Sequence, residues 1–150
     1  KANSFKRMQP NGAQPMDGIR EVLTFLDKKK KQVWVVTGSG QASLFAQLNT
    51  LHPTLFTREQ LITAYDVTHG KPHPEPYLKA WQRSGLKKEE CCVVENAPLG
   101  VRAAKSAGLF TIAVNTGILE NERLSQEKAD LVLPNMHALL QWLQEHCNEK

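Results

Sequence analysis

The chain of 150 residues has the length of one domain, enough to bury a substantial core. Hydrophobic residues make up 41% and charged residues 23% of the chain, which is the composition of an ordinary globular protein. The net charge of +4 is too small and too diffuse to indicate a nucleic-acid partner, and no apolar stretch approaches the length of a membrane span.

Residues 1–15 combine Asn, Gln, Pro and Gly without periodicity, and we interpret them as a loop or the tail of a preceding segment. Apolar residues at helical spacing then predict a helix capped by Asp17. The apolar run Val33–Val36 predicts a strand buried on both faces. A helix carrying Leu44–Leu51 and a short strand at Leu61–Tyr65 are expected to follow.

The second half of the chain continues the same alternation. A proline-rich loop leads into a helix that we expect to end at Gly85. Strands are then predicted at Cys91–Val94, Phe110–Val114 and Leu131–Leu133, and helices at Leu99–Ala107 and, with Asn135 as its cap, from Met136 to Cys147. Strands that alternate with helices predict an α/β fold, in which residues 16–150 form a three-layer, Rossmann-like parallel sheet with helices on both faces.

Polar residues lie at the ends of the predicted strands or in the loops that follow them. In an open α/β sheet these loops share one edge, where the ligand binds. Hydroxyl, ammonium and carboxylate groups would therefore converge there, which suits a phosphate beside a divalent metal. The residues concerned are Thr37, Gly38, Ser39, Lys71, Glu95 and Asn96.

Each of these signals also has an ordinary structural explanation. Thr37–Gly40 can bind an anion at a helix N-terminus, or it can simply form a turn. Lys71 stands in a loop that neighbouring prolines restrict, but a loop lysine is often only solvated. Glu95 and Asn96 offer two hard oxygen ligands of the kind that Mg²⁺ prefers, while Asn96 can also cap the next helix.

The histidines and cysteines carry weaker signals. His69 and His73 are four residues apart, but the glycine and proline between them prevent the helix that would align them, so we assign no ligand role to any histidine. The three cysteines have no metal-site spacing, and we interpret Cys91 and Cys92 as small core residues. An odd number of cysteines without a signal peptide favours a reducing compartment, and we expect a cytoplasmic protein.

Three segments together resemble a known family. VVTGSGQ, YDVTHGKPHPEPY and VVENAPLGVRAAKSAG, in this order, resemble motifs II, III and IV of the haloacid dehalogenase superfamily, in particular its β-phosphoglucomutase-like branch and small-molecule phosphatases. The resemblance runs from about Asp17 to the C-terminus. It implies that Thr37, with the backbone of Gly38 and with Ser39, binds the transferring phosphoryl group, and that Lys71 bridges this group and the nucleophile.

The same resemblance implies a Mg²⁺ site at Glu95 and its neighbour. Asn96 stands where many members of the family carry aspartate. The amide keeps an oxygen ligand but removes one negative charge, so we expect weaker metal binding at this position.

The chain departs from the family at motif I. The family takes a nucleophilic and an acid/base aspartate from a D-x-D loop after an N-terminal strand, and no segment here matches it. Asp17 follows no apolar strand, so we do not expect it to be the nucleophile. The absent strand lies at the centre of the family's sheet, between the strands that here end at Thr37 and Glu95. Its absence predicts two unpaired strand edges facing a gap.

We therefore expect this chain to be the C-terminal part of a longer enzyme whose helical cap and first strand are missing, with residues 1–15 as the tail of that cap or a linker. The leading hypothesis is Mg²⁺-dependent phosphoryl transfer on a small phosphorylated metabolite, such as a sugar phosphate, through an aspartyl-phosphate whose aspartate is not in this chain. The alternative is a non-catalytic phosphate-binding or interaction module. Nucleic-acid binding rests only on the net charge and the lysines at 28–31, and it is the least supported.

Overall fold

The computed structural model describes residues 15–40, 42–115 and 121–147, and strands alternate with helices along this length. The predicted tail at residues 1–15 lies almost entirely outside the described residues. The elements are α2 (Ile19–Lys28), β1 (Val35–Val36), α3 (Leu44–Leu51), η1 (Arg58–Gln60), β2 (Leu61–Ile62), η2 (Ala64–Asp66), α4 (Glu75–Ser84), η3 (Lys88–Glu90), β3 (Cys92–Glu95), α5 (Pro98–Ser106), β4 (Phe110–Val114), α6 (Asn121–Gln126), β5 (Leu131–Leu133) and α7 (Met136–His146). The predicted α/β class is confirmed.

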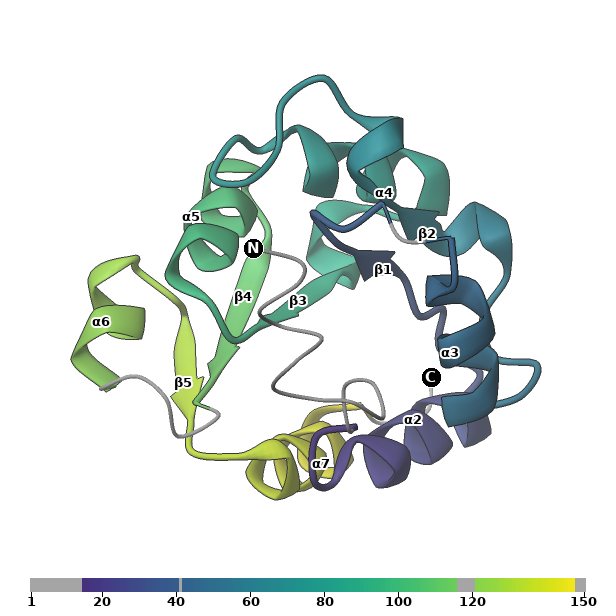
Figure 1. Ribbon diagram of the computed structural model, residues 1–150. Coiled ribbons are helices and arrows are strands. Elements are labelled where there is room, and N and C mark those ends of the chain that lie inside the picture. Colours follow the sequence, from purple (N-terminus) through teal and green to yellow (C-terminus); the bar gives the residue numbers. More distant parts are fainter. Residues whose placement is uncertain (1–14, 41, 116–120, 148–150) are drawn as a thin grey trace, which may run out of the picture.

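The strands form two separate parallel sheets. β1 pairs with β2, with Val35 opposite Leu61. β3, β4 and β5 form the second sheet in that order. Figure 1 shows β1 and β2 beside α4, and β4 and β5 on the other side of the molecule. Among the described residues no strand pairs with the inner edge of β1 or of β3, so the predicted gap between the strands that end near Thr37 and Glu95 is confirmed.

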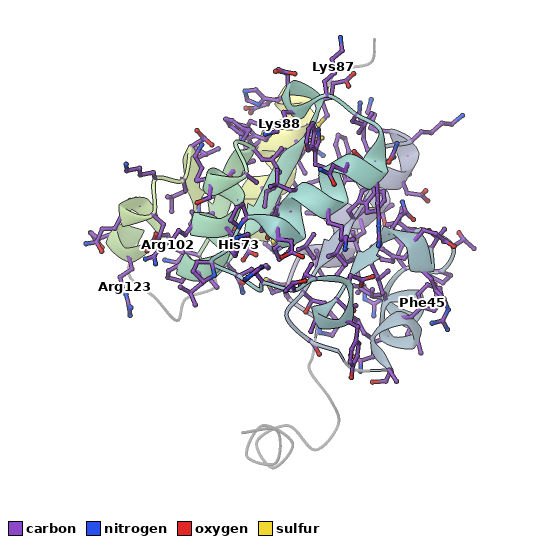
Figure 2. All side chains as sticks on the ribbon, turned by 90° about the horizontal axis from the view of Figure 1, so that it is seen from above. Phe45, His73, Lys87, Lys88, Arg102 and Arg123 are labelled. Carbon is purple, nitrogen blue, oxygen red and sulfur yellow. The ribbon has the colours of Figure 1, made fainter. Side chains whose placement is uncertain are left out.

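Helices cover both faces of the three-stranded sheet, because successive residues of a strand point to opposite faces. On one face α2 and α7 pack against β4, and the buried residues there are Val22, Ile112, Val114, Met136, Leu139 and Leu143. On the other face the neighbouring β4 residue, Ala113, packs against α5 and α6. α4 and α5 share a further cluster with β3, formed by Tyr77, Val93, Ala103, Ala104, Ala107 and Leu109. Figure 2 shows the molecule from above, with Phe45 of α3 at one end and Arg102 and Arg123 at the other.

The two-stranded sheet is shorter and less buried than the sequence predicts. β1 has two residues, both half-buried, so the expectation of a strand buried on both faces is wrong. A central strand is covered by neighbours on both edges, whereas β1 pairs only with β2. β2 ends at Ile62 because the Thr63 hydroxyl accepts the N–H of Tyr65, while the Asp66 carboxylate accepts the N–H of Thr63 at 2.8 Å. These bonds start a 3-10 helix where a longer strand was predicted.

Helix ends show which local signals dominate. The predicted cap Asn135 is confirmed, since its side chain accepts the N–H of Ala138 at 2.8 Å. Gly85 ends α4 with φ of 72°, in the left-handed region that favours glycine. The prediction that Asp17 caps α2 is wrong, because its carboxylate lies 3.2 Å from Nε2 of His137 instead. No described helix is long and apolar enough to cross a membrane.

One face of β3 remains open. Val94 and Phe110, at the start of the neighbouring strand β4, are each 42% exposed. Cys92 is exposed and Cys91 is half-buried, so the interpretation of both cysteines as core residues is wrong. The apolar character of Cys91–Val94 predicted a strand correctly, but the full burial of that strand needs a covering element that the described residues do not contain.

Asp130 connects the end of α5 to β4 just before β5 begins. Its carboxylate accepts the Thr111 N–H at 2.7 Å and the Lys105 ammonium at 2.8 Å. Burial acts to raise the pKa of Asp130, but these donors outweigh it, and the pKa lies below its ordinary value of 3.8. The folded state therefore favours the ionised carboxylate.

We expect Asp130→Asn to lower the free energy of unfolding by about 1 kcal/mol at neutral pH, because solvent screens the half-exposed ion pair. A carboxyl group whose pKa is lower in the folded state stabilises the folded protein at pH values above its unfolded pKa of about 4. This stabilisation is lost as the pH falls through the folded pKa. Denaturant titrations across this range should show the difference between the two proteins narrowing in acid. The exposed variant Glu21→Gln is the control, and a difference that stays constant would contradict the assignment.

Candidate functional site

The predicted site residues come from the carboxyl ends of β1 and β3 and from the loop before α4. Thr37 directly follows β1, Glu95 is the last residue of β3 and Asn96 follows it. Lys71 lies in the loop between η2 and α4. The structure brings the lysine to both strand ends, as the crevice rule for parallel sheets requires.

The ammonium group of Lys71 joins the two sheets. It donates to the Val36 carbonyl of β1 at 3.0 Å and to the Glu95 carboxylate of β3. The N–H of Thr37 pairs with the Ile62 carbonyl of β2 at 2.9 Å, so the Val36 carbonyl of the same peptide points away from β2, toward the open edge. Lys71 therefore satisfies an acceptor on that edge, and it is not a solvated surface lysine.

Glu95 is buried and its carboxylate is enclosed by donors. It accepts from the Lys71 ammonium, from the Tyr77 hydroxyl and, at 3.2 Å, from the N–H of Asn96. Burial, and after it the charge of Glu95, raises the pKa of Tyr77 far above its ordinary value of 10, so the phenol stays protonated and donates. The ring of Tyr77 also lies 5.0 Å from the Lys71 ammonium, a cation–π distance.

Sequence reasoning missed two residues of this site. Tyr77 and Gly100 both stand in the segments that carry the family resemblance, but neither was given a role there. In the structure α5 packs so closely on Glu95 that a Cβ at Gly100 would collide with the carboxylate. The available signal was the glycine itself, because a glycine inside a helix costs about 1 kcal/mol relative to alanine and often marks a close approach.

A pocket of about 120 Å³ lies between the end of β1 and the lysine loop, and Thr37, Gly38, Gly70 and Lys71 line it in part. The Thr37 hydroxyl oxygen accepts the N–H of Ser39 at 3.0 Å, which leaves the hydroxyl proton as a donor. A Cβ at Gly38 would meet nothing within 4 Å, so a ligand can approach the backbone there. The pocket thus presents a hydroxyl, an accessible backbone segment and an ammonium to an anion.

Asn96 is exposed and does not cap α5. The residue at the cap position is Ala97, and no side chain caps this helix, so the capping interpretation is wrong. Lys71 and Tyr77 both donate to Oε1 of Glu95, so Oε2, which accepts the Asn96 N–H, is the oxygen that can join the Asn96 amide oxygen as a hard ligand. Mg²⁺ is commonly held by one or two protein oxygens together with phosphate and water, and this donor set fits it.

Comparisons with known proteins identify the family of the chain. The profile of haloacid dehalogenase-like hydrolases matches residues 7–108. Glycerol-1-phosphate phosphohydrolase 2 of Saccharomyces cerevisiae is 33% identical over 81% of this chain and 51% of its own length. Hexitol phosphatase A of Escherichia coli is 34% identical over 87% of this chain and 58% of its own. The structure of a proposed beta-phosphoglucomutase from Bacteroides vulgatus, 42% identical, superposes with a TM-score of 0.88 over 99% of this chain and 61% of its own.

The chain belongs to the haloacid dehalogenase-like hydrolase family. The resemblance found in the sequence is thereby confirmed. The chain spans about half the length of the curated relatives that it matches.

We expect Gly100→Ala to lower the free energy of unfolding by about 1–3 kcal/mol, because the added methyl group overpacks the contact between α5 and Glu95. Chemical denaturation with circular dichroism measures this. Gly70→Ala is the control, since a Cβ there would meet nothing within 4 Å. Equal stability of the two variants would show that α5 moves away from Glu95 at no cost.

Proposed function

We propose that the protein transfers a phosphoryl group of a small phosphorylated metabolite, as a phosphosugar mutase or a phosphatase. The observation that carries this proposal is the meeting of Thr37, Lys71 and Glu95 at the ends of two parallel sheets. The names of the relatives support a sugar or polyol phosphate as the substrate. Phosphoryl transfer depends mainly on positioning and on neutralising charge, which these groups supply.

The residues of this chain bind and orient the phosphoryl group. In this proposal the Thr37 hydroxyl and the backbone at Gly38 donate to its oxygens, with Ser39 beside them. The Lys71 ammonium has three donors, of which Val36 and Glu95 engage two, so the third is available to the phosphoryl oxygens. Glu95 keeps this ammonium in place, and the Tyr77 hydroxyl orients Glu95.

Glu95 and Asn96 would hold a Mg²⁺ ion, which when bound neutralises charge on the phosphoryl group and on the attacking carboxylate. We propose that an aspartate outside this chain attacks phosphorus and displaces the substrate oxygen. The strand that carries it would pair with the inner edges of β1 and β3. Water then cleaves the aspartyl-phosphate, or a second substrate molecule takes the phosphoryl group.

The alternative is a phosphate-binding module without turnover. It is favoured by one observation, that no carboxylate is among the residues that line the pocket in the described part of the chain. Both functions require phosphate to bind at Thr37 and Lys71, and only the first requires hydrolysis once the missing aspartate is supplied.

We expect the 150-residue chain alone to show no phosphatase turnover, because none of its segments matches the D-x-D motif that carries the nucleophile in the resembling family. A longer protein that supplies a preceding D-x-D strand should show Mg²⁺-dependent hydrolysis of a generic phosphate ester. Lys71→Ala should reduce that rate by about a hundredfold or more. Lys87→Ala is the control, because Lys87 lies at an edge of the molecule (Figure 2) and precedes the start of β3, whereas the site lies at the end of that strand. Turnover by the chain alone that Lys71→Ala abolishes would show that the nucleophile lies within it.

We expect Asn96→Asp to tighten Mg²⁺ binding by about tenfold, because the added charge strengthens an oxygen site. Asn96→Ala should weaken binding, and calorimetric titration with Mg²⁺ compares the three proteins. If all three bind Mg²⁺ equally, Asn96 is not a ligand.

A further inference from the structure

The loop around Lys71 brings together two histidines and a glutamate, although no helix aligns them. The rings of His69 and His73 stack with centroids 4.6 Å apart and an interplanar angle of 25°. Nδ1 of His69 lies 3.1 Å from Oε2 of Glu75. One ligand atom from each of the three residues lies within 4.8 Å of the other two.

Hydrogen bonds hold this arrangement without a metal. The Glu75 carboxylate accepts the backbone N–H groups of Thr68 and His69, each at 2.8 Å, and the Glu75 N–H donates to Nδ1 of His73 at 3.1 Å. The bonds from Thr68 and then from His69 hold the pKa of Glu75 below its ordinary value of 4.5. The carboxylate is therefore ionised at neutral pH and fixed relative to both rings.

We propose that His69, His73 and Glu75 bind one transition-metal ion such as Zn²⁺. Two imidazoles and one carboxylate are a common set of three protein ligands for zinc, and the remaining positions face water. The 3.1 Å separation of His69 and Glu75 is close to the ligand–ligand distance of about 3.4 Å around a tetrahedral zinc. His69 is 62% exposed and His73 is also exposed, so both rings can turn to close the remaining distance.

Metal binding has a local signature at the Glu75 amide. If His73 coordinates through Nδ1, the metal displaces the Glu75 N–H. If it coordinates through Nε2, the ring proton moves to Nδ1, and the same hydrogen bond is lost. Either route leaves the Glu75 N–H without this acceptor. The bound metal would link His69, which precedes Lys71, to His73 and Glu75, which follow it, independently of any phosphoryl transfer.

The first test is calorimetric titration of the protein with Zn²⁺ in excess Mg²⁺. We expect one ion per chain, with affinity reduced about tenfold or more by His69→Gln, His73→Gln or Glu75→Gln. His137→Ala should change nothing, although that histidine also lies beside a carboxylate, that of Asp17. The Glu75 amide resonance should shift on zinc binding in the original protein and not in His73→Gln.

Cysteine thiolates also bind Zn²⁺, so a second measurement distinguishes thiolate ligands from the proposed histidine–glutamate site. Co²⁺ bound by thiolates gives a near-ultraviolet charge-transfer absorption that a histidine–carboxylate site lacks. Stoichiometric binding without this absorption supports the proposal. Absence of stoichiometric binding, unchanged affinity in folded His69→Gln and His73→Gln variants, or a thiolate spectrum would each overturn it.

Discussion

The ammonium group of Lys71 connects two sheets that share no strand. It reaches the Val36 carbonyl on one side and the buried Glu95 carboxylate on the other. Removing Lys71 would leave the buried Glu95 carboxylate without its opposite charge, which costs several times more than an exposed pair contributes. Gly100 and Tyr77 both serve this contact, since one allows α5 to approach the carboxylate and the other donates to it.

The same interaction explains why structural and candidate functional residues coincide here. α4 packs on both sheets through Tyr77, whose cluster includes Val36 of β1 and Val93 of β3. The loop that carries Lys71 is fastened to the start of α4 by Glu75. The position of the lysine is thus fixed by its backbone, its helix and its acceptors before any ligand arrives. Pre-organised donors of this kind contribute most to the stabilisation of developing charge.

What the sequence predicts well is what depends on local pattern. Thr37 and Glu95 lie at strand ends, and Lys71 lies in the loop before α4. Asn135 and Gly85 mark helix ends, because their chemistry acts within one turn. The sequence predicts poorly those features that depend on contacts between residues far apart in the chain. To predict the burial of β1 correctly, one would have to know that only one neighbouring strand pairs with it.

Other errors have the same origin. Asp17 has the side chain of a cap, but His137, far along the chain, holds it elsewhere. Gly100 is needed because of Glu95 in another element, and spacing alone gives no sign of this contact. The stacking of His69 on His73 arises from a loop conformation that Glu75 fixes, whereas sequence reasoning considered only a helix.

The division into two sheets also affects the order in which the chain can fold. Among the described residues β1 pairs with β2, β3 with β4, and β4 with β5, so each pairing joins strands that are consecutive along the chain. Units of this kind, whose strand pairings are internal, can open and close separately. The link between Lys71 and Glu95 spans only 24 residues, so the second unit can dock on the first soon after β3 forms. During synthesis the lysine loop would thus be in place before the C-terminal helix emerges.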